Sequence, residues 1–146
     1  MVLFRKLQKA TQFSSSDWLY FFQAWIWLFL FDIGLRTRSF SGLKNFASQL
    51  DFHSTRTPEQ TESLLRKLAV IVDHARYNHL YPMTCLRRSL TLQKMLARQG
   101  IFTELKIGAR KDDGQLSAHA WLEYQGEIIG EKEEIRGKFR ALKKGT

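Results

Sequence analysis

One cysteine and one histidine are the residues of this sequence whose types and spacing could do chemistry. Cys85 is the only cysteine, and Thr84 before it predicts the start of a helix in the segment Tyr-Pro-Met-Thr-Cys-Leu-Arg-Arg-Ser-Leu. His119 follows 34 residues later, in the strand-like segment Ser-Ala-His-Ala-Trp-Leu-Glu. This arrangement is typical of a thiol nucleophile with its general base. Because the separation is too long for a local contact, the fold has to bring the two side chains together.

The alternative for Cys85 is a small buried apolar side chain. The dipole of the predicted helix favours a thiolate by only about 0.3–1 kcal/mol, so a cationic partner has to contribute as well. Arg87 and Arg88 are close in sequence but cannot take or return a proton, whereas a histidine can. A catalytic cysteine therefore requires a histidine elsewhere in the chain.

Four histidines could supply that base. We expect His53, His74 and His79 in polar helix ends and loops, where a solvated histidine is ordinary. His119 lies between two alanines and close to Trp121, in a segment suited to burial. A strand histidine on its own is more often structural, but its pairing with Cys85 favours a catalytic role.

An orienting acid for His119 can be sought by strand geometry. Glu123 follows on the same strand, some 13 Å away at about 3.3 Å per residue, which is too far to hold the ring. We therefore look to the next strand, after the turn that contains Gly126.

The turn type decides which acid lies opposite His119. A two-residue turn would require positive φ at Gln125, so we expect a type I turn with Gly126 as the left-handed bulge residue. That register pairs Glu123 with Glu127 and His119 with Glu131, so Glu131 could fix the imidazole tautomer. The alternative for Glu131 is a solvated member of a charged run.

Composition limits the function classes. The 146 residues carry a net charge of +9, enough for solubility or for attraction to an anionic membrane surface, nucleic acid or an acidic peptide. We find no RNA-binding signature and no glycine-rich phosphate loop, and His74 and His79 are five residues apart, a poor metal pair. We therefore expect no metal site and no nucleic-acid partner, and the family resemblance described below implies no organic cofactor either.

The predicted elements are helices followed by strands. Ser16 or Asp17 would cap the first helix, and Thr57, Pro58 and Gln60 form a capping-box start for the third. The expected helices cover 18–35, a short stretch within 36–56, 57–77 and 85–99; the expected strands cover 101–110, 116–124 and 127–130; a last helical turn is expected around Phe139 and Leu142.

The aromatic run from Trp18 to Phe31 has no cleavage site like that of a signal peptide. Its 14 residues are short of the roughly 20 that a spanning helix needs, and Asp32 follows. We expect a buried helix or one that lies in a membrane interface, where tryptophan and tyrosine rings are also common.

The motifs resemble those of the transglutaminase-like leader peptidases of lasso peptide biosynthesis, often called the B protein or its C-terminal half. The similar blocks include the segment from Cys85 to Leu92, Lys106–Arg110 and Ala118–Glu123, and the region 31–36. The resemblance implies an α+β fold with a papain-like core, in which the nucleophile helix packs on a small antiparallel sheet. It implies an N-terminal helical segment, 1–56, on a protease core, 57–146, within a single domain.

By that resemblance Cys85 is the nucleophile, His119 the base and Glu131 the orienting acid, although the family usually has aspartate at the third place. The implied activity is that of a bacterial, cytoplasmic cysteine peptidase that removes the leader from a ribosomally synthesised lasso peptide precursor. The implied partners are the precursor's leader peptide, a separate leader-recognition protein and an asparagine-synthetase-like cyclase. Backbone N–H of Cys85 would bind the oxyanion.

Two other classes stay open. One is a non-catalytic adaptor with a papain-like core that binds a membrane surface or a partner, which the aromatic helix and the positive charge favour. The other is a thiol acyltransferase or amidase that acts on another substrate.

Overall fold

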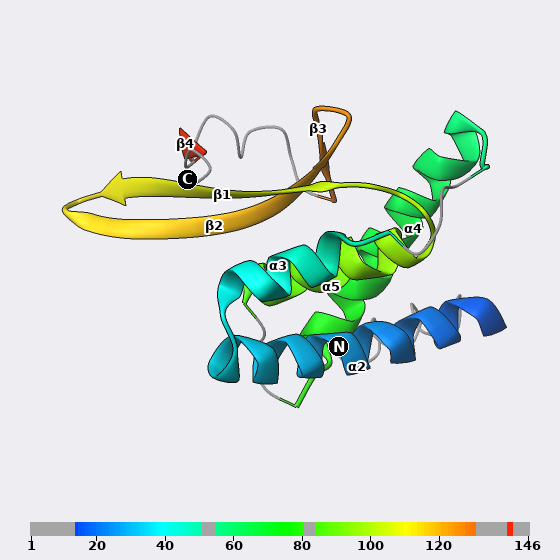
Figure 1. Ribbon diagram of the computed structural model, residues 1–146, viewed down its shortest axis with the longest axis horizontal. Helices are drawn as coiled ribbons and strands as arrows, with labels where there is room; N and C mark the ends of the chain where they lie inside the picture. Colours follow the sequence, from blue (N-terminus) through cyan, green and yellow to red (C-terminus); the bar gives the residue numbers. More distant parts are fainter. Residues whose placement is uncertain (1–13, 51–54, 81–83, 131–139, 142–146) are drawn as a thin grey trace, which may run out of the picture.

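The computed structural model describes residues 14–50, 55–80, 84–130 and 140–141. Four helices lie beneath a small twisted sheet (Figure 1). The elements in chain order are α2 (Ser15–Thr37), α3 (Phe40–Ser48), α4 (Pro58–Tyr77), α5 (Cys85–Arg98), β1 (Glu104–Asp112), β2 (Gln115–Tyr124), β3 (Glu127–Ile129) and β4 (Arg140–Ala141).

Helix α5 is the centre of the molecule. It contacts α2, α3 and α4 as well as β1 and β2, and Figure 1 shows it between the sheet and α2. Ten consecutive residues, from Arg88 to Ala97, are buried. The predicted α+β class, with the cysteine helix packed on an antiparallel sheet and additional N-terminal helices, is confirmed.

Both N-terminal helices share the core of the later elements. Leu28 and Phe31 of α2 and Ala47 of α3 belong to the same buried cluster as Leu68 of α4 and Leu90 of α5. The shared core agrees with a single domain overall. The predicted division into segments 1–56 and 57–146 is not tested by this packing and stays a prediction.

Capping decides where the helices begin. The predicted capping box of α4 is confirmed, with Thr57 and Gln60 bonded to each other's backbone N–H groups. The predicted cap of α2 at Ser16 or Asp17 is wrong, because Ser14 is the N-cap. Asp17 is the third helical residue and bonds back to the Ser14 N–H, which completes a second capping box.

Asp17 also ties α2 to α4. Its Oδ1 lies 2.6 Å from the ammonium nitrogen of Lys67. This hydrogen bond is the largest cause of a pKa for Asp17 below its usual value, and the bonds to Ser14 add to it against the opposing effect of burial. The start of α2 is therefore held both by its own backbone and by a neighbouring helix.

The sheet has the order β3-β2-β1-β4, with all neighbours antiparallel. Arg140 and Ala141 pair with Ala109 and Gly108 of β1. These two residues were expected in a helical turn, which is wrong for them; Phe139 and Leu142 lie outside the described residues. Pairing with β1 is favoured over a helical turn because the edge of β1 would otherwise present an open row of backbone donors and acceptors.

The β2–β3 turn differs from the expected one. Gln125 and Gly126 both have positive φ, 50° and 83°, so the turn is of the two-residue kind and pairs Tyr124 with Glu127. The predicted pairing of Glu123 with Glu127 is wrong by one residue.

Burial explains the register that the chain adopts. It sets Ile129 opposite Leu122, and both side chains are buried in the core. Burying a side chain such as Ile129 contributes about 1.5–3 kcal/mol. A left-handed conformation at Gln125 costs roughly 1–2 kcal/mol, so the burial outweighs the strain. A one-residue slip would turn Ile129 to the other face of the sheet.

Replacing Gln125 by glycine should stabilise the protein, because glycine adopts positive φ without strain. We expect the free energy of unfolding to rise by about 0.5–1 kcal/mol in Gln125→Gly, measured by urea denaturation. The matched control is Gln115→Gly in β2, which removes the same side chain from extended backbone and should lower stability by a similar amount. Destabilisation in both variants would contradict this turn.

Candidate active site

Cys85 is the first residue of α5. Its thiol is not in a disulfide, is partly exposed and packs against the hydrophobic core. The residue before it, Thr84, has extended backbone, and its carbonyl accepts the first helical hydrogen bond, from the Arg88 N–H at 3.0 Å. The predicted position of the cysteine at a helix start is confirmed.

The side chain of Thr84 does not cap the helix, contrary to expectation. Its hydroxyl accepts instead from the Arg87 guanidinium, at 2.8 Å from Nη1. The N–H groups of the first turn of α5 therefore have no side-chain cap. Such groups can donate to a thiolate or to an oxyanion that forms beside it.

Arg87 is fixed by Asp32 of α2. Its Nε lies 2.5 Å from Asp32 Oδ1, and Arg36 Nε lies 3.3 Å from Oδ2. Asp32 is only 2% exposed, so its charge needs these cations. Arg87 thus links α2 to the residue immediately before the cysteine.

In the sequence, Asp32 was recognised only as the residue that ends an apolar run, and its pairing with Arg87 was not predicted. The signal was present, because a single carboxylate within an apolar helix has to find a cationic partner when it is buried. What the sequence did not indicate was which of 23 basic residues that partner would be.

His119 lies on β2 and is partly buried. Its ring stacks on Trp121, with centroids 6.1 Å apart and planes at 19°. The Trp121 Nε1–H donates to Glu123 Oε1 at 3.1 Å. Because alternate residues share a face, these three side chains lie on one side of β2, and Ala120 and Leu122 lie on the side that joins the core.

A buried hydrogen bond connects the cysteine helix to the histidine strand. Ser89 Oγ donates to the Ala120 carbonyl oxygen at 3.2 Å. Ser89 is about one helical turn after Cys85, and Ala120 is the residue after His119. The two candidate residues are therefore carried by elements in direct contact, each close to a shared anchor point.

The two side chains themselves are not joined. Within the part of the chain that the structure describes, no hydrogen bond links Cys85 Sγ to the His119 ring. Strand alternation turns the imidazole away from the face of β2 that packs on α5. The structure brings together the backbones that carry the pair, without hydrogen-bonding the thiol to the imidazole.

Glu131 lies outside the described residues, as does His53. The register that predicted Glu131 opposite His119 is the one that the β2–β3 turn overturns. The orienting role of Glu131 therefore rests on the family resemblance alone and stays a prediction.

His79 has a structural environment rather than the solvated loop that we expected. Its ring stacks on Trp25 at 4.3 Å between centroids, and its Nε2 lies 3.0 Å from the Trp25 carbonyl oxygen. This packing holds the segment after α4 against α2. His74 is partly buried near the end of α4, where its carbonyl accepts from the cap residue Asn78.

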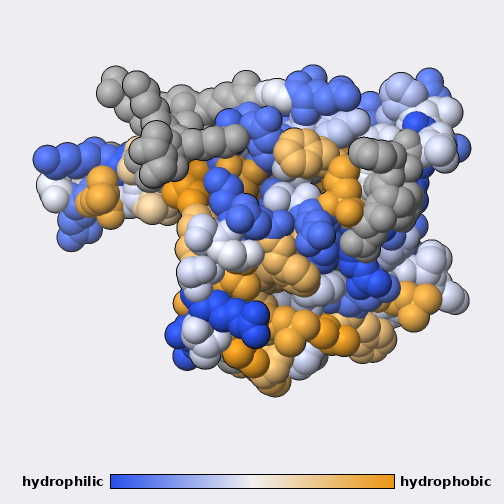
Figure 2. All heavy atoms as spheres, viewed as in Figure 1, coloured by the Kyte–Doolittle hydropathy of each residue, from blue (hydrophilic) through white to orange (hydrophobic). Residues whose placement is uncertain are grey.

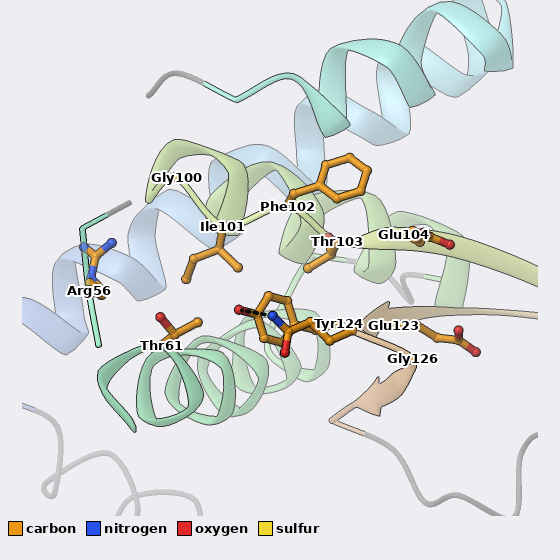
Figure 3. A pocket seen from close by; sticks show the side chains of 11 residues that line it. Arg56, Thr61, Gly100, Ile101, Phe102, Thr103, Glu104, Glu123, Tyr124 and Gly126 are labelled. Atoms are coloured by element: carbon orange, nitrogen blue, oxygen red, sulfur yellow. Dashed lines mark hydrogen bonds between the residues drawn. The ribbon is translucent and has the colours of Figure 1, made fainter. Parts of the chain in front are cut away.

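A hollow of about 520 Å³ lies beside the β2–β3 turn and the start of β1 (Figure 3). The lining residues are Arg56, Thr61, Gly100, Ile101, Phe102, Thr103, Glu104, Glu123, Tyr124, Gln125 and Gly126. Neither Cys85 nor His119 lines the hollow.

The described residues include no cluster of three or more histidine, cysteine or acidic side chains that could hold a metal ion.

Comparison with known protein families identifies the family of this chain. The family model of the transglutaminase-like superfamily matches residues 27–144, which is most of the chain. No curated protein and no solved structure matches.

The buried carboxylate at the cysteine helix should be costly to neutralise. We expect Asp32→Asn to lower the free energy of unfolding by about 2–4 kcal/mol, because it leaves the partly buried Arg87 without its counter-charge. The matched control is Glu62→Gln, which breaks an exposed ion pair with Arg66 and should cost under about 0.5 kcal/mol. Chemical denaturation measures both, and equal effects would show that Asp32 does not anchor α5.

Proposed function

Because this chain belongs to the transglutaminase-like superfamily, we propose that it is a cysteine peptidase that removes the leader from a lasso peptide precursor. The superfamily consists largely of enzymes that use a cysteine, as peptidases or transferases. The narrower assignment to leader removal draws on the resemblance of the Cys85–Leu92 and Ala118–Glu123 segments to lasso leader peptidases.

The observation that carries the proposal is the contact between α5 and β2. The hydrogen bond from Ser89 to the Ala120 carbonyl anchors the strand of His119 against the helix that begins with Cys85. The uncapped first turn of α5 adds donors where a thiolate and an oxyanion need them. A nucleophilic cysteine needs both features, a histidine strand held nearby and free N–H donors at the start of its helix.

In the proposed reaction, His119 takes the proton of the Cys85 thiol, and the resulting thiolate attacks the carbonyl carbon of the scissile peptide bond. The negative charge that forms on the carbonyl oxygen is bound by the Cys85 N–H. His119 then gives a proton to the leaving amine, and the leader and core peptides separate at an acyl-enzyme. A water molecule gives its proton to His119 and attacks the acyl carbon, which releases the thiolate.

This chemistry requires the imidazole to come within hydrogen-bond reach of the thiol. Catalytic hydrogen bonds that are long or absent in an empty site commonly tighten in the substrate complex. Glu131 would orient the imidazole in that state. The substrate is the precursor peptide, and the proposal assigns leader recognition to a separate protein and ring closure to a cyclase in the bacterial cytoplasm.

One observation favours a second candidate, the non-catalytic adaptor. Ala120 and Leu122 join the core that contains α5, so strand alternation places the His119 ring on the opposite face of β2, an arrangement that an adaptor has no need to reverse. The acyltransferase or amidase alternative uses the same thiol and base, and differs only in its substrate. A reactive thiol is expected of both enzymes and not of the adaptor. The peptidase and the acyltransferase or amidase are then distinguished by the product that each forms.

Cys85→Ala should abolish leader removal. We expect cleavage to fall by at least about 1000-fold, because the nucleophile has no substitute, and His119→Ala should be about as damaging. Glu131→Gln should cost less than either, since it disturbs orientation and not bond making. The measurement is mass spectrometry of a synthetic lasso peptide precursor incubated with the full chain and a purified leader-recognition protein.

His74→Ala is the matched control and should retain cleavage. Alkylation of the single thiol by iodoacetamide at neutral pH gives a readout that needs no substrate. His119→Ala should slow it, and His74→Ala should not. Cleavage that survives Cys85→Ala would exclude a thiol peptidase, and alkylation that is unaffected by His119→Ala would favour the adaptor.

A further inference from the structure

One face of α2 exposes a continuous apolar stripe. Six large side chains, each between 37% and 65% exposed, follow one another at three- and four-residue spacing or closer. At 3.6 residues per turn they occupy about 100° of the helix circumference. They are Leu19, Phe22, Ile26, Phe29, Leu30 and Ile33.

The opposite face of α2 is already used. Ala24, Leu28 and Phe31 are in the hydrophobic core, and Asp32 is ion-paired with Arg87 of α5. The helix is thus apolar on both sides, and the described part of the chain covers only one of them. A helix that is apolar all round is normally buried on every side, so the exposed stripe needs a second apolar environment.

We infer that α2 lies in the interface of a membrane that contains anionic lipids, with its axis parallel to the surface. Its 23 residues extend for about 35 Å, and the stripe would enter the boundary between headgroups and acyl chains. Figure 2 shows apolar side chains along the lower edge of the molecule, where α2 lies in Figure 1.

A spanning orientation fits the packing less well. By length and composition α2 could cross a bilayer, so the expectation that it is too short is wrong. Asp32 decides the matter, because its carboxylate is bonded to Arg87 beside the start of α5. Moving α2 into the hydrocarbon layer would break that ion pair and remove three side chains from the core.

The charges near α2 favour lipid over a protein partner. In residues 14–50 the two acidic side chains, Asp17 and Asp32, are both held by cations of other helices. Basic residues flank the stripe: the Arg36 side chain is 66% exposed, and Arg38 follows at the C-cap. Each basic residue near an anionic leaflet contributes about 1 kcal/mol, and the whole chain carries +9.

The borders of the stripe have the residues that membrane interfaces favour. Trp18, which is 38% exposed, lies on the same flank as Arg36. Exposed Phe40 of α3 follows the end of α2, whereas Phe46 of α3, which is also partly open to solvent, packs against Trp27 and Phe31 of α2. Tryptophan rings beside basic side chains occupy the headgroup level in membrane-bound proteins. The inference does not depend on the peptidase proposal, since it uses no candidate catalytic residue.

Vesicle sedimentation of the purified full chain tests the inference. We expect the protein to pellet with vesicles of phosphatidylcholine and phosphatidylglycerol in a 3:1 ratio, and much less with phosphatidylcholine alone. Ile26→Glu and Phe22→Glu should each weaken binding by about tenfold or more, because they place a charge at the centre of the stripe. Both sites are exposed, so the thermal midpoint should stay near that of the wild type.

Leu116→Glu is the matched control. It makes the same change in charge at a side chain that is 76% exposed on β2, outside the stripe, and should bind vesicles like the wild type. Thiol alkylation should be unchanged in all three variants, since none touches Cys85 or His119.

Failure of the wild type to pellet with anionic vesicles would overturn the inference, and so would equal binding by Ile26→Glu. Equal binding to neutral vesicles would overturn the preference for anionic lipid. Self-association or binding to a purified partner protein that Ile26→Glu abolishes, without vesicle binding, would make the stripe a protein interface. Resistance of membrane-bound protein to carbonate extraction would overturn the parallel orientation in favour of a spanning one.

Discussion

The burial of α5 from Arg88 to Ala97 is the constraint on which the rest of this structure depends. In a helical segment with no solvent face, polar side chains need hydrogen-bond partners on neighbouring elements. Arg88 Nε donates to Asp73 Oδ1 of α4 at 2.8 Å, and Ser89 donates to the backbone of β2. A hydrogen bond is strong only when donor and acceptor are aligned. Each of these bonds therefore fixes where one neighbouring element lies around α5.

Two further buried polar residues of α5 also bond to neighbouring elements, whereas the Thr91 hydroxyl, which is buried as well, has no hydrogen-bond partner among the described residues. Gln93 Nε2 donates to the Thr103 carbonyl at 3.1 Å, just before β1, and Lys94 Nζ lies 3.4 Å from the Phe46 carbonyl oxygen of α3. An apolar helix of the same shape could slide or rotate against its neighbours at small cost. Buried polar groups make such shifts costly, because each displaced donor would lose its partner without gaining water. The location of Cys85 is thereby set from four directions.

The same constraint explains why α2 combines a structural role with an exposed apolar surface. Its inner face has to cover α5 and supply Asp32 to Arg87, which holds the cap residue of the cysteine helix. Its outer face does not contact α5 and carries large exposed apolar side chains. If the outer face lies on a membrane, the ion pair at Asp32 connects the membrane-facing helix directly to the start of α5.

Local signals in the sequence determined the helix starts and the class of the fold. The Thr57–Gln60 capping box, the first-turn position of Cys85 and the strand of His119 all follow from neighbouring residues, and the structure confirms them. The short motifs also indicated the transglutaminase-like superfamily, which the match over residues 27–144 shows, while the narrower resemblance to lasso leader peptidases stays a prediction. The tertiary structure alone decided the β2–β3 register, the partner of Asp32, the strand at Arg140–Ala141 and the face of β2 that carries His119. Each depends on residues far apart in the chain: burial of Ile129 outweighed local strain at Gln125, and a buried carboxylate took the cation that packing brought within reach.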